Sequence, residues 1–413
     1  MERVILHVDF NFFYASVECF YHPELRDKPV AICGNVEQRH GIILAKTPQA
    51  KKYGVSTGEA IWQAKQKCPG LITVEAHYDL YMKFSSAARK IYERYSDNIE
   101  AFGLDENWID LTGSSLLFGS GEKVAEELRQ TIKQELGITV SIGVSWNKIF
   151  AKLGSDMKKP DAITVITRDN FKSKVWPLPA SDLLYVGPAT TRKLIRYGIR
   201  TIGDIAALKP EFLRGLLGKW GETLWAFANG FDISPVTKLD YVSAIKSIGN
   251  SMTTWRDIET PDDAWKVFTV LSESVASRLR KHGFRAHTIQ ISIRDVNLSW
   301  LERQTKLELP SCTAWEISKK AMELFLKNCN FHVPLRALGV RACDLSDNSS
   351  GQQLMFFEDA VQREKRERLE SNVDLLRGRF GKDAIKRAVL INDDITSESD
   401  PLTHEIHPVA FNF

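Results

Sequence analysis

Residues 3–21, RVILHVDFNFFYASVECFY, decide the fold at the start of this chain. The stretch opens with a short apolar run of strand length that ends at Asp9. Phe13, Val17 and Phe20 then recur at helical spacing. The first unit therefore begins with a strand that leads directly into a helix.

The next segments complete a ferredoxin-like pattern. Residues 97–113, DNIEAFGLDENWIDLTG, predict two strands that meet in a hairpin. Residues 121–137 predict an amphipathic helix, and residues 138–145, ITVSIGVS, predict the strand that follows it. The order βαββαβ predicts an α+β fold in which residues 23–78 are inserted as a separate small unit.

The composition is that of a globular protein with several domains. The chain has 413 residues, of which 43% are hydrophobic and 26% charged, which excludes a disordered or collagen-like chain. No apolar run is long enough to cross a bilayer, and His7 and Asp9 interrupt the N-terminal run that a signal peptide would need. Six scattered cysteines contain no CxxC pair and indicate reduced thiols. We expect a cytoplasmic protein with no membrane partner.

The middle of the chain is basic and predicts contact with a polyanion. Residues 166–344 hold 26 Lys and Arg against 18 Asp and Glu. Residues 183–199 and 212–230 each resemble a helix-hairpin-helix, whose tight glycine turn presents backbone N–H groups to phosphate. Ordinary solvated helices with two plain connections explain the same patterns equally well, so both readings stay open at this point.

Three acidic residues are the candidates for chemistry. Asp9 closes the first strand, and Asp105 with Glu106 lies in the hairpin that a ferredoxin-like sheet places beside it. Because Mg²⁺ prefers oxygen ligands, a cluster of carboxylates suits two-metal phosphoryl transfer. Exposed acids at strand ends are also common without any metal, and the pattern alone does not decide between the two.

Three longer motifs resemble those of the Y-family (translesion) DNA polymerases of the bacterial DNA polymerase IV type. They are HVDFNFFYASVE, FGLDENWIDLTG and SIGVSWNKIFAKLGSDMKKPDAI, and the resemblance extends to about residue 357. It implies an α+β right-hand polymerase with a ferredoxin-like palm, small fingers, a helix-hairpin-helix thumb and an α+β little finger. The implied boundaries are palm 1–22 and 79–166, fingers 23–78, thumb 167–231, linker 232–243, little finger 244–345, and a clamp-binding peptide and tail in 346–413.

The resemblance also implies roles for individual residues. Two Mg²⁺ ions per site would be held by Asp9, Asp105, Glu106 and the backbone carbonyl of Phe10. Tyr14 corresponds to the steric gate that excludes ribonucleotides. The implied nucleotide contacts are Phe13, Tyr14, Lys51 and Lys159, with Lys158 as the alternative to Lys159 if the loop register differs. The implied DNA contacts are Gly187, Ala189 and Thr190.

The fingers depart from the family pattern. Where relatives commonly read TANYxARKFGV, this chain reads AKTPQAKKYGV, so Ala45, Pro48 and Lys51 replace a hydroxyl residue, a tyrosine and an arginine. Gly103 also replaces the usual serine before the Asp-Glu pair. The acids are retained, but the affinity for the incoming nucleotide does not carry over from the family.

A short apolar peptide near the C-terminus resembles the QLxLF motif by which bacterial polymerases bind the sliding clamp. It consists of Gln353, Leu354, Met355, Phe356 and Phe357 and follows a polar stretch. The alternative is a buried strand of the little finger. Beyond it the sequence predicts a charged helix and then a flexible terminus.

We therefore expect a monomeric, template-directed, low-fidelity DNA polymerase that performs translesion synthesis on primer-template DNA with dNTPs. No residue run suggests a proofreading exonuclease. The alternative is a non-catalytic accessory protein of the same fold that binds DNA and the clamp, and a nucleotide cyclase is a more distant third. Retention of all three acids favours the enzyme over the accessory protein.

Overall fold

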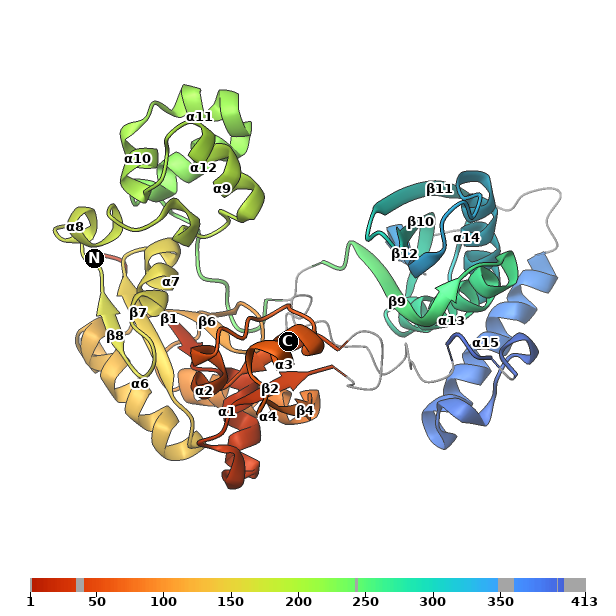
Figure 1. Ribbon diagram of the computed structural model, residues 1–413, viewed down its shortest axis with the longest axis horizontal. Helices are drawn as coiled ribbons and strands as arrows, with labels where there is room; N and C mark the ends of the chain where they lie inside the picture. The colour runs from red at the N-terminus through yellow and green to blue at the C-terminus, as the bar shows by residue number, and fades with distance from the viewer. Residues whose placement is uncertain (1, 35–40, 242–243, 348–359, 392, 397–413) are drawn as a thin grey trace. The chain divides into compact units, whose positions relative to one another are not determined.

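The computed structural model describes residues 2–34, 41–241, 244–347, 360–391 and 393–396 of the chain (Figure 1). These residues form two compact units that meet in sequence at residues 242–243. Each unit has its own sheets, helices and hydrophobic core, so each is described by itself. None of the described helices combines the length and the apolar character needed to span a membrane.

The central sheet of the first unit has five strands in the order β5-β6-β1-β7-β8. Every neighbouring pair is antiparallel except β7 and β8, which are parallel. The predicted hairpin is present as β5 and β6, and β1 lies between β6 and β7 at the centre. The strands are β1 (Ile5–Phe10), β5 (Ile99–Ala101), β6 (Glu106–Asp110), β7 (Val140–Ser145) and β8 (Ile163–Val165).

The two faces of β1 meet different helices. Leu6, Val8 and Phe10 pack into the main core, to which α4 and α6 contribute. On the other face Ile5 packs against Ala151 of α7. Both faces of β1 are therefore covered, and the strand is buried along its whole length. The helices around the sheet are α1 (Phe13–Tyr21), α4 (Tyr78–Tyr92), α5 (Ser115–Phe118), α6 (Gly121–Leu136) and α7 (Lys148–Met157).

A glycine in β7 brings α7 unusually close to the sheet. A Cβ atom built on Gly143 would lie 1.9 Å from the carbonyl oxygen of Ala151 and 2.6 Å from the backbone nitrogen of Ser155. Any side chain at this position would push α7 outward, because both neighbours are backbone atoms. The polar residues of α7 therefore reach the face of β1 that carries the acids.

Three short strands between residues 30 and 34 and between residues 41 and 75 form a small sheet in the order β3-β2-β4. It has its own core of buried residues, which includes Ile43 and Leu71. Its elements are β2 (Val30–Cys33), β3 (Ile43–Lys46), α2 (Pro48–Lys52), α3 (Ile61–Lys67) and β4 (Ile72–Glu75). The predicted inserted unit corresponds to this sheet, although the predicted domain boundaries along the chain stay predictions.

A bundle of short helices follows the central sheet and surrounds a third core that includes Phe150 and Leu213. Its helices are α8 (Phe171–Val175), α9 (Pro188–Arg196), α10 (Ile202–Ala207), α11 (Pro210–Leu217) and α12 (Lys219–Ala228). The segment after α12 lies against the central sheet: Val236 is buried beside Ile5 and Trp108, and the Thr237 nitrogen donates to Glu100.

The second unit is a four-stranded sheet in the order β11-β10-β12-β9, with α13 and α14 packed against it (Figure 1). Two of its strands, β9 and β11, were not predicted from the sequence. The elements are β9 (Ser247–Ile258), α13 (Pro261–Lys281), β10 (Phe284–Asp295), β11 (Trp300–Ser311), α14 (Ala314–Asn328) and β12 (Leu335–Asp347).

The charged helix α15 (Ala360–Phe380) packs on the second unit through ion pairs. Arg280 of α13 contacts Glu370 and Asp374 at 2.7 Å each, and Arg285 forms a bidentate pair with Glu367. Further along, Ile395 is fully buried in the core of the unit. The expectation of a flexible terminus is therefore wrong for residues 381–396 as far as they are described.

Candidate active site

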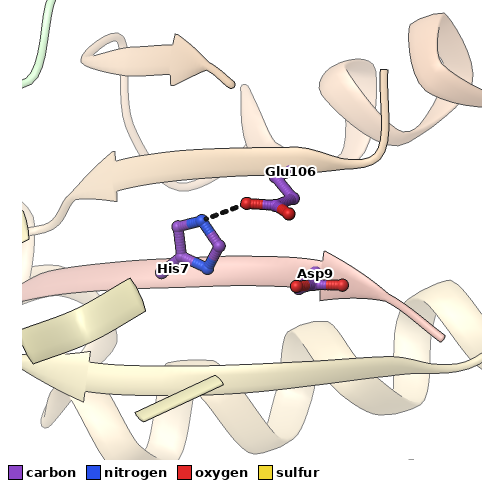
Figure 2. Close-up of side chains that lie close together, drawn as sticks. All are labelled: His7, Asp9 and Glu106. Atoms are coloured by element: carbon purple, nitrogen blue, oxygen red, sulfur yellow. Dashed lines mark ion pairs between the residues drawn. The ribbon is translucent and has the colours of Figure 1, made fainter. Parts of the chain in front are cut away.

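The pairing of β1 with β6 brings the three predicted acids to one end of the sheet. Asp9 pairs directly with Glu106 across the two strands. The Phe10 nitrogen donates to the Asp105 carbonyl at 3.1 Å. Figure 2 shows Asp9 and Glu106 on the same face of the sheet, where they lie next to His7.

Gly103 shapes the turn that presents Asp105. Its φ of +88° lies in the region that favours glycine. A Cβ built there would be 3.5 Å from Asp105 Oδ1, which is an ordinary contact. The backbone conformation, rather than lack of space, therefore accounts for glycine where relatives commonly have serine.

The carboxyl groups of Asp9, Asp105 and Glu106 are mostly buried, and their negative charges repel one another. Burial, together with the charges of Glu106 and Asp9, raises the pKa of Asp105 to about 7. Burial and the charge of Glu106 also raise the pKa of Asp9. Burial alone would raise the pKa of Glu106 as well, but its contacts with His7 and Lys152 lower it. A bound cation would relieve the repulsion among these groups.

Two lysines of the third sequence motif lie over the acids. Lys152 Nζ is 2.6 Å from Glu106 Oε2 and 3.5 Å from Asp9 Oδ2. Lys159 Nζ is 2.8 Å from Asp9 Oδ2, and Asp156 contacts both ammonium groups at 3.3 and 2.9 Å. Lys158, the alternative to Lys159, is exposed. Lys152 and Lys159 therefore bring positive charge to the acids, and Asp156 contacts both lysines.

Asn11 fixes the loop that carries Lys159, and sequence reasoning missed it. The Asn11 side chain is buried and donates to Ser141 Oγ at 2.9 Å. Its Oδ1 accepts from Thr139 Oγ1 at 3.0 Å and from the Asp161 nitrogen at 2.7 Å. One amide thus ties the β1–α1 turn to β7 and to the lysine loop, a role that no local sequence signal indicates.

The predicted steric gate is part of an aromatic stack. The Tyr14 ring lies 4.2 Å from that of Tyr81, and the two planes differ by 11°. The Tyr81 hydroxyl donates to Glu18 Oε1 at 2.6 Å, so the stack is anchored on α1 itself. The neighbouring Phe13 is 3% exposed, so its side chain belongs to the core.

The altered fingers place two lysines near each other. Pro48 is the first residue of α2, a position that tolerates proline because its N–H would be unpaired there. Lys51 on the same helix is exposed. Burial and the charge of Lys51 lower the pKa of Lys46, which the sequence analysis did not single out.

The predicted DNA contacts lie at the start of a helix. Gly187 is the N-cap of α9, Pro188 is the first residue of the helix, and Ala189 after it is exposed. Thr190 follows and is partly exposed. Residues 353–357, the predicted clamp peptide, lie outside the described residues.

The side chains at the acidic end fit a divalent cation. His7, Asp9 and Glu106 each offer one ligand atom, and these atoms lie within 4.8 Å of one another. Lys152 Nζ and His7 Nε2 both contact Glu106 Oε2, at 2.6 and 3.3 Å. A set dominated by carboxylate oxygens suits Mg²⁺ rather than a softer metal.

Comparisons with known proteins agree with this geometry. Residues 8–156 match the impB/mucB/samB family, and residues 245–355 match the C-terminal domain of that family. The chain is 56% identical over 393 residues to the DNA polymerase IV of Acetivibrio thermocellus, covering 95% of this chain and 98% of that protein. It is 36% identical to DNA polymerase IV 2 of Bacillus subtilis over 94% of each. A solved Y-family DNA polymerase chimera has a similar fold, with a TM-score of 0.72 and 24% identity over 84% of this chain and 100% of the other.

The fold and the relatives define the class of enzyme as a DNA-directed DNA polymerase. Within that class, the chain belongs to the impB/mucB/samB family of Y-family (translesion) DNA polymerases, of the bacterial DNA polymerase IV type. The resemblance and the fold class expected from the sequence are confirmed.

Proposed function

We propose that this polymerase extends a primer by two-metal nucleotidyl transfer, in which the primer 3′-hydroxyl attacks the α-phosphate of a dNTP. The observation that carries the proposal is the pairing of Asp9 with Glu106 across β1 and β6, with Asp105 directly before Glu106 on the chain. The pKa values of Asp9 and Asp105 are raised and that of Glu106 is lowered, as close charges in a buried site cause. Because these side chains offer carboxylate oxygens, which Mg²⁺ prefers, we propose two Mg²⁺ ions as the cofactor.

The residues around the acids have separate tasks in this proposal. Asp9, Asp105, Glu106 and the Phe10 carbonyl would hold the ions. Mg²⁺ bound there would lower the pKa of the 3′-hydroxyl and neutralise charge on the triphosphate and the pyrophosphate leaving group.

Lys159 adds positive charge for the triphosphate. Its ammonium group lies 2.8 Å from Asp9 and is held by Asp156 on its other side. In this proposal, most of the rate enhancement comes from positioning the primer and the dNTP and from neutralising the negative charge of the triphosphate.

Tyr14 would select the sugar. Its ring is held by the stack on Tyr81, which Glu18 anchors, so it is a rigid wall rather than a mobile side chain. A ribose 2′-hydroxyl that meets this wall is rejected by steric overlap. Burial raises the pKa of Tyr14, so the phenol stays neutral beside the triphosphate.

The exposed N-terminus of α9, formed by Gly187, Ala189 and Thr190, would bind a DNA phosphate. Backbone N–H groups at a helix start bind phosphate without reading bases.

The proposal also includes docking on the sliding clamp through residues 353–357, which rests on the sequence motif alone. Replacing Gln353, Leu354 and Phe357 by Ala should leave synthesis on short primers unchanged and remove stimulation by a loaded clamp.

The test is primer extension by the purified protein with Mg²⁺ and one dNTP at a time. Addition of only the template-matched nucleotide supports the proposal, whereas DNA binding without extension supports the accessory-protein alternative. Synthesis without proofreading is checked in the same assay. A mismatched, 3′-labelled primer incubated with Mg²⁺ but no dNTP should keep its terminal nucleotide.

A further inference from the structure

A buried histidine lies directly behind the catalytic acids. His7 is fully buried on β1, two residues before Asp9, and its side chain is on the same face of the sheet. Its Nε2 is 3.3 Å from Glu106 Oε2, as the dashed line in Figure 2 shows. Among the described residues, neither this nitrogen nor Glu106 Oε2 has a regular hydrogen-bond partner, and the two atoms lie at ion-pair distance from each other.

The strand register explains why this contact forms. His7 pairs with Trp108, and Glu106 is two residues before Trp108 on the same strand. His7 and Glu106 are therefore diagonal neighbours on one face, a distance that long side chains span. The Trp108 ring meets the imidazole edge to face at 5.1 Å, so the histidine ring cannot turn away from Glu106 without disturbing the sheet surface.

Ser155 of α7 determines which nitrogen faces Glu106 as a donor. Its Oγ lies 2.8 Å from His7 Nδ1 and 2.7 Å from the carbonyl oxygen of Lys152. The Ser155 hydroxyl has one proton to donate. If it donated that proton to the Lys152 carbonyl, a neutral His7 imidazole would carry its own proton on Nδ1. The lone pair on Nε2 would then face the Glu106 carboxylate. Donation from Ser155 to Nδ1 instead leaves the proton on Nε2, so that both contacts are attractive.

The competing carbonyl loses little in this arrangement. Lys152 lies inside α7, where its carbonyl accepts the regular helical bond. A protonated imidazole would donate from both nitrogens, so His7 is a donor to Glu106 in either state. The close approach of α7 over Gly143 is what brings Ser155 within reach of the histidine.

We propose that His7 is a positioning residue for the metal site: it donates a hydrogen bond from Nε2 to Glu106 Oε2, with its tautomer set by Ser155, and so turns the other carboxylate oxygen toward the metal. Lys152 Nζ contacts the same oxygen, Glu106 Oε2, at 2.6 Å. One oxygen of Glu106 is thus occupied by two donors, which leaves Oε1 for the ion. The inference rests on the proposed role of Glu106 as a metal ligand.

The experiment compares metal binding and catalysis in four variants of the full chain. His7→Phe removes the donor but keeps a ring, His7→Gln keeps a side-chain N–H, and Ser155→Ala removes the group that orients the proton. His22→Phe is the matched control, because His22 pairs with Glu24 at 3.4 Å on the surface. Mn²⁺ affinity is measured by electron paramagnetic resonance on a complex with a dideoxy-terminated primer-template and dNTP, which does not turn over. The Mg²⁺ concentration for half-maximal extension is measured separately.

We expect His7→Phe to weaken Mn²⁺ binding and to raise the half-saturating Mg²⁺ concentration by about 10–100-fold, as removal of a partner behind a ligand does. Ser155→Ala should show a smaller change in the same direction. His7→Gln should recover most of the loss, and His22→Phe should match the wild type. Melting temperatures and primer-template affinity should be similar in all variants.

Three results would overturn the inference. Wild-type Mn²⁺ affinity in His7→Phe would show that the contact is idle. An equal loss in His7→Gln and His7→Phe would show that only packing matters. Nitrogen coupling from His7 in the Mn²⁺ spectrum would make it a direct ligand. If the wild type failed to extend primers, the proposed function would fail, but the Mn²⁺ comparison would still test His7 by itself.

Discussion

Asp105→Asn should make the metal-free protein more stable above neutral pH while removing activity. The pKa of Asp105 is raised from its ordinary value of 3.8 to about 7 by burial and by Glu106 and Asp9. About three pKa units at about 1.36 kcal/mol each correspond to about 4 kcal/mol, and about 3 kcal/mol remains after relaxation around the charge. Because the folded-state pKa of Asp105 is the higher one, the contribution of this group to wild-type stability is fully present below about pH 4 and is lost as the pH rises through about 7.

The assay is calorimetry of wild type and Asp105→Asn in EDTA at several pH values. At pH 8 the variant should unfold about 6–12 °C higher, since about 1 kcal/mol corresponds to about 2–4 °C for a unit of this size. The difference should vanish near pH 4, and Mg²⁺ should stabilise only the wild type. Asp169→Asn, at an exposed acid, serves as the control. Equal unfolding temperatures in EDTA at pH 8 would refute the view that the site stores repulsion that a metal relieves.

Three further predictions concern the sugar, the triphosphate and the C-terminal helix. Tyr14→Ala should lower the ratio of dNTP to rNTP incorporation, because it removes a rigid wall; an unchanged ratio would make Tyr14 a packing residue only. Lys159→Ala should raise the dNTP KM more than Lys51→Ala does, since Lys159 reaches the acids whereas Lys51 is exposed on α2; steady-state kinetics with the reverse order would contradict this. Glu370→Gln should destabilise the second unit by about 2 kcal/mol in a denaturant titration, because it removes the carboxylate that Arg280 and Arg387 both contact, while Asp374 remains beside Arg280; no change would show that α15 is held by other contacts.

Local patterns were sufficient to predict the strands and helix around the three acids of the central sheet. The buried strand ending at Asp9, the helix after it and the hairpin before Glu106 follow from apolar spacing, and the structure has all three. The proximity of the acids followed from the order of these elements, because a ferredoxin-like sheet places the first strand beside the hairpin. These features depend on neighbours that are close in sequence or on a common topology.

Contacts between distant segments could not be predicted in the same way. The role of His7 depends on the β1–β6 register and on how closely α7 approaches over Gly143, and neither is written in a local pattern. The helix α15 carries so many charges that it resembles a solvated helix. Its partners Arg280 and Glu273 lie far away in sequence, so the ion pairs that hold it become visible only in the folded unit.

The two strands that sequence reasoning missed show a further limit. In β9 four of the 12 residues are buried, and in β11 only one of 12 is buried. Both are edge strands of the sheet, and each buries too few apolar residues to give a clear period-2 pattern. Their pairing with β12 and β10 is decided by the whole sheet rather than by their own composition.

The most direct measurement of the central claim is single-nucleotide extension by the wild type and by Glu106→Gln, with primer-template affinity determined on the same preparations. The account predicts that the wild type adds the template-matched nucleotide in Mg²⁺, and that the variant binds DNA equally well but extends it at least about 10²-fold more slowly, because a lost ligand removes charge stabilisation in the transition state. Comparable extension by Glu106→Gln would contradict the claim that the acidic end of β1 and β6 is the catalytic centre.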